Sequence, residues 1–143
     1  MKFRYKKFAR GAYAPMLRPI IPIEISYGEN SIKHEMLVDS GADMCLVDAE
    51  IGEILNIPIE NGERHLVTGV SGQPEPYYNH PVKIVVGGWE YEVEVGFKRN
   101  LSSDYGLAGQ LGFFQFFTVK FDYQKEQIEL KRKEEFGKPA SFA

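Results

Sequence analysis

The sequence predicts a single, mostly β domain with many short strands and one short helix. Two observations carry this prediction: apolar and polar residues alternate over several segments, and glycine or proline interrupts those segments at short intervals. The length of 143 residues is near the commonest size of one domain, and 43% hydrophobic with 26% charged residues is ordinary for a globular protein. Short strands joined by glycine turns indicate a small barrel or a sandwich.

The first regular element is predicted over residues 20–39, as a hairpin. Ile21, Ile23 and Ile25 fall on one face of its first strand, and the sequence GENS supplies the turn. Pro22 predicts that this strand lies at the edge of a sheet, because proline cannot donate a hydrogen bond to a neighbouring strand.

A short helix is expected after the strand MCLVD. Asp48 can cap its N-terminus, and Ile51, Ile54 and Leu55 form its apolar face. Pro58 ends the helical segment, since a residue that precedes proline avoids helical backbone angles.

Further hairpins are predicted along the rest of the chain, interrupted by the loop KRNLSSDYG and by LAGQLGFFQFF, a turn followed by a short helical piece. The segments RHLVTGV and QPEPYYNHPVKIVV flank the tip TGVSGQ, and VVGGWEYEVEVGF turns at Gly87 and Gly88. A final hairpin is expected in FTVKFDYQKEQIELKRK. Four alternating side chains of its first strand are expected to point inward: Phe117, Val119, Phe121 and Tyr123.

The two ends of the chain differ from the middle in composition. We interpret residues 1–19 as a basic N-terminal extension, residues 20–133 as the domain and residues 134–143 as a C-terminal tail. The extension is either a solvated tail, an edge strand whose lysines discourage aggregation, or a contact for an acidic surface.

Bulk properties exclude several classes of function. The net charge of −3 does not favour a nucleic-acid partner, and no apolar run is long enough to cross a membrane. The N-terminus lacks the apolar region of a signal peptide, and the single cysteine, Cys45, favours a reducing compartment. We therefore expect a soluble, cytoplasmic protein.

The segment LVDSGADMCLV delivers a carboxylate, Asp39, to the end of a buried strand, where an unpartnered aspartate is costly. Gly41 is expected to adopt a backbone conformation closed to other residues, so that its N–H points at the carboxylate. Ala42 keeps the site small, and Ser40 supplies a hydroxyl. One carboxylate activates water poorly, whereas two held about 3 Å apart share a proton and act as base and acid.

Residues 37–42, Leu-Val-Asp-Ser-Gly-Ala, resemble the apolar-apolar-Asp-Ser/Thr-Gly-Ala signature of retropepsin-like aspartic proteases, in a member of the bacterial or archaeal type. The resemblance implies a closed small β-barrel with one short helix and an obligate homodimer. It makes Asp39 the catalytic residue, with Ser40, Gly41 and Ala42 as the active-site loop. Because the chain holds one such motif, the second carboxylate is implied to be Asp39 of a second copy.

Two further segments resemble features of that family in the same order. The tip TGVSG resembles the flap that closes over the substrate, and GLAGQLGFF resembles the apolar-apolar-Gly motif that threads behind the active loop. Asp43 either binds the substrate backbone or caps a turn of the loop. The implied substrate-binding residues are Asp43, Thr68, Gly69, Val70, Ser71, Gly72, Leu107 and Gly109.

Three positions depart from the family pattern. Cys45 stands where a hydroxyl residue is frequent, Ala108 where a larger apolar residue is usual, and Gln110 where viral members often have arginine. The change at Gln110 puts the interface ion pairs of the family in doubt, whereas the catalytic pair is unaffected.

The resemblance implies a homodimeric aspartic endopeptidase, a hydrolase that cuts a polypeptide substrate without cofactor or metal. The spacing of His34, His65 and His80 gives no metal-binding pattern. One alternative is a peptide-binding or dimerisation module of the same fold with little or no catalysis. Another is an unrelated β-barrel in which Asp39 caps a loop.

Overall fold

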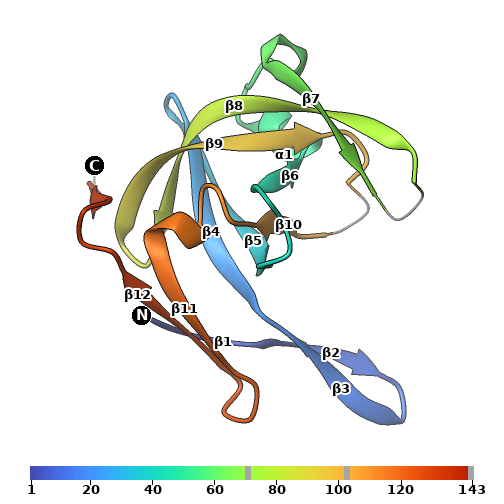
Figure 1. The fold of residues 1–143 in the computed structure, drawn as a ribbon, viewed down its shortest axis with the longest axis vertical. Coiled ribbons are helices and arrows are strands. Elements are labelled where there is room, and N and C mark those ends of the chain that lie inside the picture. The colour runs from blue at the N-terminus through green and yellow to red at the C-terminus, as the bar shows by residue number, and fades with distance from the viewer. Residues whose placement is uncertain (70–71, 102–103, 142–143) are drawn as a thin grey trace.

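The computed structural model describes residues 1–69, 72–101 and 104–141. Within these ranges the chain is mostly β, with one α-helix and two 3₁₀ turns (Figure 1), so the predicted class is confirmed. In chain order the elements are β1 (Lys2–Arg4), β2 (Lys6–Arg10), β3 (Tyr13–Arg18), β4 (Ile20–Tyr27), β5 (Asn30–Val38), β6 (Leu46–Asp48), α1 (Ala49–Ile54), η1 (Ile59–Asn61), β7 (Glu63–Thr68), β8 (Pro74–Val86), β9 (Trp89–Lys98), β10 (Gly106–Ala108), η2 (Phe114–Phe116), β11 (Phe117–Asp122), β12 (Gln127–Arg132) and β13 (Lys138–Pro139).

The largest sheet has the strand order β13-β9-β6-β10-β5-β4-β8-β7, and β8 also pairs with β9. Pairing therefore returns to its start, from β9 through β6, β10, β5, β4 and β8 back to β9. The side chains inside this circuit form the core, and the largest fully buried ones include Phe97, Phe113, Ile21, Ile23 and Ile25. Strand β10 pairs with β5 in parallel and with β6 antiparallel, so it lies between the two strands that flank Asp39.

The hairpin predicted over residues 20–39 is present as β4 and β5, but its first strand is not at an edge. Strand β4 pairs with β5 on one side and with β8 on the other. Pro22 is nevertheless accommodated, because β8 contacts β4 only from Glu24 to Ser26. Pro22 therefore faces Glu35 of β5 and has no ladder partner on its other side. The edge prediction was wrong for the strand as a whole.

The hairpin β8–β9 turns at Gly87 and Gly88, as predicted, and both glycines have positive φ, at +55° and +85°. A two-residue turn of this kind requires left-handed backbone at both positions, which glycine adopts without steric cost. The hairpin contributes Tyr91, Val93 and Val95 to the core.

Helix α1 begins at Asp48, whose Oδ1 accepts a hydrogen bond of 2.9 Å from the Glu50 N–H, so the predicted cap is confirmed. The predicted apolar face was partly wrong, because Ile54 is 62% exposed. A Cβ at Gly52 would lie only 2.6 Å from Ile59, so the helix packs closely through its smallest residue. The buried face is therefore centred on Gly52 and Leu55, and Ile54 points away. In the described part of the chain, no helix has the length and apolar character needed to cross a membrane.

The C-terminal hairpin β11–β12 extends past the body of the protein (Figure 1). Phe117 is buried and Val119 half-buried, as the alternation predicted, but Phe121 is 43% and Tyr123 65% exposed. The alternation holds from Phe117 to Lys120, whereas the inward placement of the last two side chains was wrong. Near the outer end of the hairpin, the Tyr123 ring makes an edge contact with the Tyr5 ring.

Both ends of the chain are folded onto other strands. β1 is an edge strand of the sheet β1-β12-β11, and the Met1 amino group donates to the Leu130 carbonyl at 3.0 Å. β2 and β3 form a separate two-stranded sheet. Near the C-terminus, β13 pairs with the start of β9, from Lys138 opposite Glu90 to Pro139 opposite Trp89.

Candidate active site

The end of β5 positions Asp39 through hydrogen bonds on both sides of the strand. The Val38 N–H donates to the Pro19 carbonyl at 2.8 Å, and the Asp39 N–H donates to the Ala108 carbonyl at 3.0 Å. Val38 points into the core, and Asp39, the next residue, is half-buried. The carboxylate is therefore presented from a strand end that neighbouring backbone holds in place.

The turn after Asp39 wraps around its carboxylate. The Gly41 N–H donates to Asp39 Oδ1 at 2.9 Å, and the Ala42 N–H donates to the Asp39 carbonyl at 3.2 Å. The predicted N–H contact is present, but the predicted reason was wrong, since Gly41 does not have a positive φ. A Cβ at position 41 would lie 3.2 Å from Asp39 Oδ1, so a side chain here would crowd the carboxylate.

Residues after β10 support the loop from behind. The Gln110 N–H donates to the Ala42 carbonyl at 2.8 Å, and the Leu111 N–H donates to the Asp43 carbonyl at 3.0 Å. The Gln110 side chain adds a third bond, from Nε2 to the Ser40 carbonyl at 2.7 Å. Residues 40, 42 and 43 are thus attached to one short segment.

Gly109 and Leu107 lie in this supporting segment, as the sequence predicted for their position behind the loop. A Cβ at Gly109 would lie 2.3 Å from the Met44 carbonyl oxygen and 2.6 Å from that of Ala42. Leu107 is half-buried, with Leu37 of β5 on one side and Leu46 of β6 on the other. Only glycine allows the segment to approach the loop so closely.

Cys45 is buried beneath the same loop, and its Sγ–H donates to the Leu111 carbonyl at 3.5 Å. Burial raises the pKa of the thiol to about 11, against a smaller opposing effect of a backbone hydrogen bond at Gly109. The thiol is therefore protonated at neutral pH and is a packing and hydrogen-bonding group, because nucleophilic chemistry requires the thiolate.

The segment that resembles a flap begins where the β7–β8 hairpin ends. Thr68 is the last residue of β7 and faces Pro74 of β8, and the Gly72 N–H donates to the Gly69 carbonyl at 3.0 Å. Thr68, Gly69 and Gly72 are exposed, whereas Val70 and Ser71 lie outside the described residues.

Tyr77 is a residue near the loop that the sequence did not identify. It is buried on β8 and stacks on His65 of β7, with ring centroids 5.5 Å apart. Burial raises the pKa of its phenol, and the negative charges of Asp43 and Glu63 raise it further. The middle of the hairpin is therefore within electrostatic reach of Asp43. Only the register that places Tyr77 opposite His65 could have indicated this contact.

One of three comparisons with known proteins finds a similar fold. No protein-family model and no curated protein sequence matches the chain. The crystal structure of a retropepsin-like aspartic protease from Rickettsia conorii is similar, with a TM-score of 0.56 and 16% sequence identity over 91% of each chain. This chain has the retropepsin-like fold.

Within this retropepsin-like fold, Asp39, Asp43 and Cys45 bring two carboxylates and a thiol to one loop. Across residues 1–69, 72–101 and 104–141, no three His, Cys, Asp or Glu side chains converge as metal ligands. The chemistry available at the loop is that of a carboxylate oriented by a backbone N–H, with exposed Asp43 beside it.

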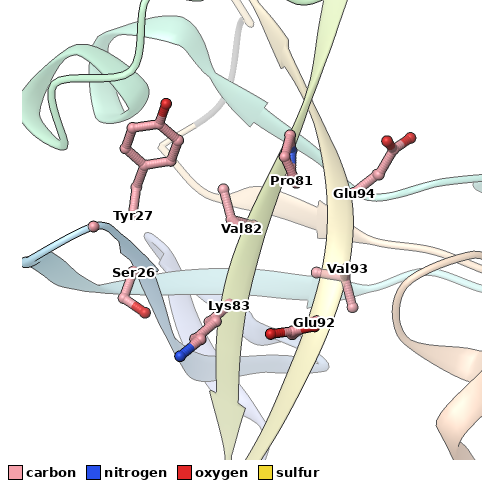
Figure 2. A pocket seen from close by; sticks show the side chains of 9 residues that line it. Ser26, Tyr27, Pro81, Val82, Lys83, Glu92, Val93 and Glu94 are labelled. Atoms are coloured by element: carbon pink, nitrogen blue, oxygen red, sulfur yellow. The ribbon is translucent and has the colours of Figure 1, made fainter.

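A surface pocket of about 580 Å³ lies elsewhere on the retropepsin-like fold (Figure 2). Its walls include Tyr27 at the β4–β5 turn, Val82 of β8 and Val93 of β9, and Val82 lies between the other two in this view. Asp39 follows the opposite end of β5, so this pocket is separate from the Asp39 loop.

Proposed function

We propose that this protein is an aspartic endopeptidase that acts as a homodimer, with Asp39 of each protomer forming the catalytic pair. The observation that carries the proposal is the position of the Asp39 carboxylate. It stands at a strand end, accepts the Gly41 N–H at 2.9 Å, and belongs to a loop supported by residues 109–111. Preorganised carboxylates of this kind keep their orientation while a substrate reacts.

The proposed chemistry needs two carboxylates that share one proton. The ionised carboxylate removes a proton from a water molecule, whose oxygen attacks the peptide carbonyl carbon. The protonated partner gives its proton to the carbonyl oxygen. When the tetrahedral intermediate collapses, the carboxyl group that took the proton of water gives it to the nitrogen, and the C–N bond breaks. The other carboxylate takes a proton back from a hydroxyl of the intermediate, so the products are an amine and a carboxylic acid and the pair again shares one proton.

The second carboxylate comes from a second copy, because the chain holds one Asp-Ser-Gly motif. A twofold axis between the two Asp39 residues brings the same residue of both copies together, and twofold dimers are the commonest oligomers. Ser40 of each protomer then bonds to the partner's loop, and the strand circuit of each protomer closes as a small barrel.

The remaining site residues bind an extended polypeptide. The segment from Thr68 to Gly72, at the end of β7–β8, covers the substrate, and Asp43 holds its backbone. Leu107 contributes apolar surface beside Leu37. A flap built on an exposed hairpin can open to admit a polypeptide substrate and close to exclude water.

The test compares the wild type with Asp39→Asn on an unfolded protein substrate between pH 4 and 7. We expect fragments from the wild type only, and a specific activity that falls on dilution as the dimer dissociates. Asp122→Asn serves as a matched control, since that aspartate caps the β11–β12 turn instead of approaching the loop.

Three results would contradict the proposal. Equal cleavage by wild type and Asp39→Asn would assign the activity to another group. A dimeric wild type without activity would favour a peptide-binding module of the same fold, and a strictly monomeric protein at high concentration excludes a shared pair.

A further inference from the structure

The hairpin β2–β3, here called the arm (residues 6–18), extends from the body without packing into either larger sheet. In the described part of the chain, β2 and β3 pair only with each other. Figure 1 shows the arm projecting beyond the other elements, on the same side as the free end of β7–β8. An isolated two-stranded hairpin is marginally stable in water, so this shape indicates that something else contacts it.

The base of the arm is attached to the body by charged and polar contacts. Lys6 forms an ion pair with Glu35 of β5, and the Lys7 Nζ lies 3.4 Å from Glu126 Oε2. Arg18 donates to the Tyr105 hydroxyl. These contacts come from three parts of the chain, so they give the arm a defined direction.

The outer half of the arm is exposed and mainly apolar. Residues 9–15 are all exposed, and Tyr13 is 78% exposed. Its one charged side chain is Arg10, whose Nε–H donates to the Ala14 carbonyl at 2.9 Å. A hairpin that projects in a fixed direction and carries an exposed aromatic ring and one arginine has the composition typical of the centre of a protein–protein contact.

We propose that the arm binds a second copy of this chain and thereby stabilises the dimer that the proposed function requires. The arm ends at Arg18, and the Pro19 carbonyl that follows accepts the Val38 N–H, one residue before Asp39. A twofold axis between two Asp39 residues therefore places the partner beside the base of each arm. The arm extends the contact made at the Asp39 loop.

The charge distribution favours a second copy as the occupant. The arm holds four of the 17 basic residues and none of the 20 acidic ones. The rest of the chain therefore has 13 basic and 20 acidic residues, a net charge of −7 beside the +4 of the arm. A positively charged arm meets an acidic body when two copies associate, which favours the encounter and its orientation.

The first experiment shortens the arm and keeps its base. Lys7 and Leu17 are direct partners across the hairpin, so residues 8–16 can be replaced by Asn-Gly as a two-residue turn. The contacts of Lys6, Lys7 and Arg18 with the body are retained. In an Asp39→Asn background, which prevents self-cleavage, sedimentation should show a dimer dissociation constant raised at least about tenfold.

The control is Ile54→Ala, which removes a similarly exposed apolar side chain from α1 and should leave the dissociation constant unchanged. A dimeric wild type that shortening does not weaken would overturn the role of the arm and leave the proposed function intact. A wild type that stays monomeric would instead contradict the proposed function, and the arm proposal with it.

A second experiment reports the contact directly. Tyr13→Cys introduces an exposed thiol, while Cys45 is buried and has a pKa of about 11, so a fluorophore labels position 13 selectively. We expect the label emission to change over the protein concentrations at which the dimer forms. Emission that stays constant while sedimentation records dimerisation would overturn the proposal. It would be overturned equally if the emission changed only on addition of another acidic protein.

Discussion

The Asp39 loop and the end of the β7–β8 hairpin are both turns that contain glycine, yet they are held in opposite ways. The loop accepts hydrogen bonds from Gln110 and Leu111, and Gly109 lies directly against it. The hairpin end has an internal bond from Gly72 to Gly69 and exposed residues around it. In the proposed protease, the first arrangement keeps the direction of the catalytic carboxylate, and the second suits a flap.

The glycines themselves show the same contrast. A Cβ at Gly109 would meet two carbonyl oxygens within 2.6 Å, whereas a Cβ at Gly69 would have nothing within 4 Å. At position 109, glycine allows two backbone segments to approach closely. At position 69, no neighbouring atom requires glycine.

The largest effect is expected for Gly109→Ala, which tests the close support of the loop. Backbone atoms cannot move aside as a flexible side chain can, so we expect a loss of about 3 kcal/mol in the free energy of unfolding. Urea denaturation measures it, with Gly69→Ala as the matched control, which should be neutral or slightly stabilising. Equal stability of the two variants would remove the contrast between the regions.

A smaller effect is expected for Gly72→Ala at the hairpin end. Gly72 has φ of +75°, and a residue with a Cβ pays about 1 kcal/mol to adopt that backbone. Hydrogen exchange should show faster exchange in β7 and the start of β8, with little change in β5 and β10. Faster exchange at the Asp39 loop as well would show that the two regions are coupled.

Gln110→Ala removes the side-chain support of the loop and leaves its backbone support in place. The Nε2–H bond to the Ser40 carbonyl is exposed, so we expect a loss of about 1 kcal/mol or less. In the proposed protease, activity should fall more than stability does, because the loop loses orientation. Chemical denaturation and peptide cleavage measure the two quantities, and a fall in stability alone would contradict this expectation.

The smallest effect concerns His34 on β5, the strand that leads to Asp39. Burial lowers its pKa from 6.5, although Glu35 and Asp48 oppose this shift. The unfolded chain therefore takes up the proton first as pH falls below 6.5, so the free energy of unfolding decreases there. His34→Gln should reduce this dependence in urea denaturation between pH 5 and 7.5, and an unchanged slope would contradict it.

Local patterns of the chain were sufficient for the hairpins, the class of fold and the position of the carboxylate. Alternation predicted β4–β5 and β8–β9, and the pair Gly87–Gly88 predicted the turn between β8 and β9. Asp48 could be recognised as a helix cap because its partner is two residues away. These features depend on neighbours in sequence, which one chain displays directly.

Distant contacts decided the rest. Nothing near Phe121 or Tyr123 indicates that β11–β12 extends past the core, and nothing near Ile54 indicates that α1 packs through Gly52. The support of the Asp39 loop depends likewise on Gln110, 71 positions along the chain from Asp39. Periodicity records which side of an element is apolar, but the surface that covers that side is set only when segments far apart in the chain pack together.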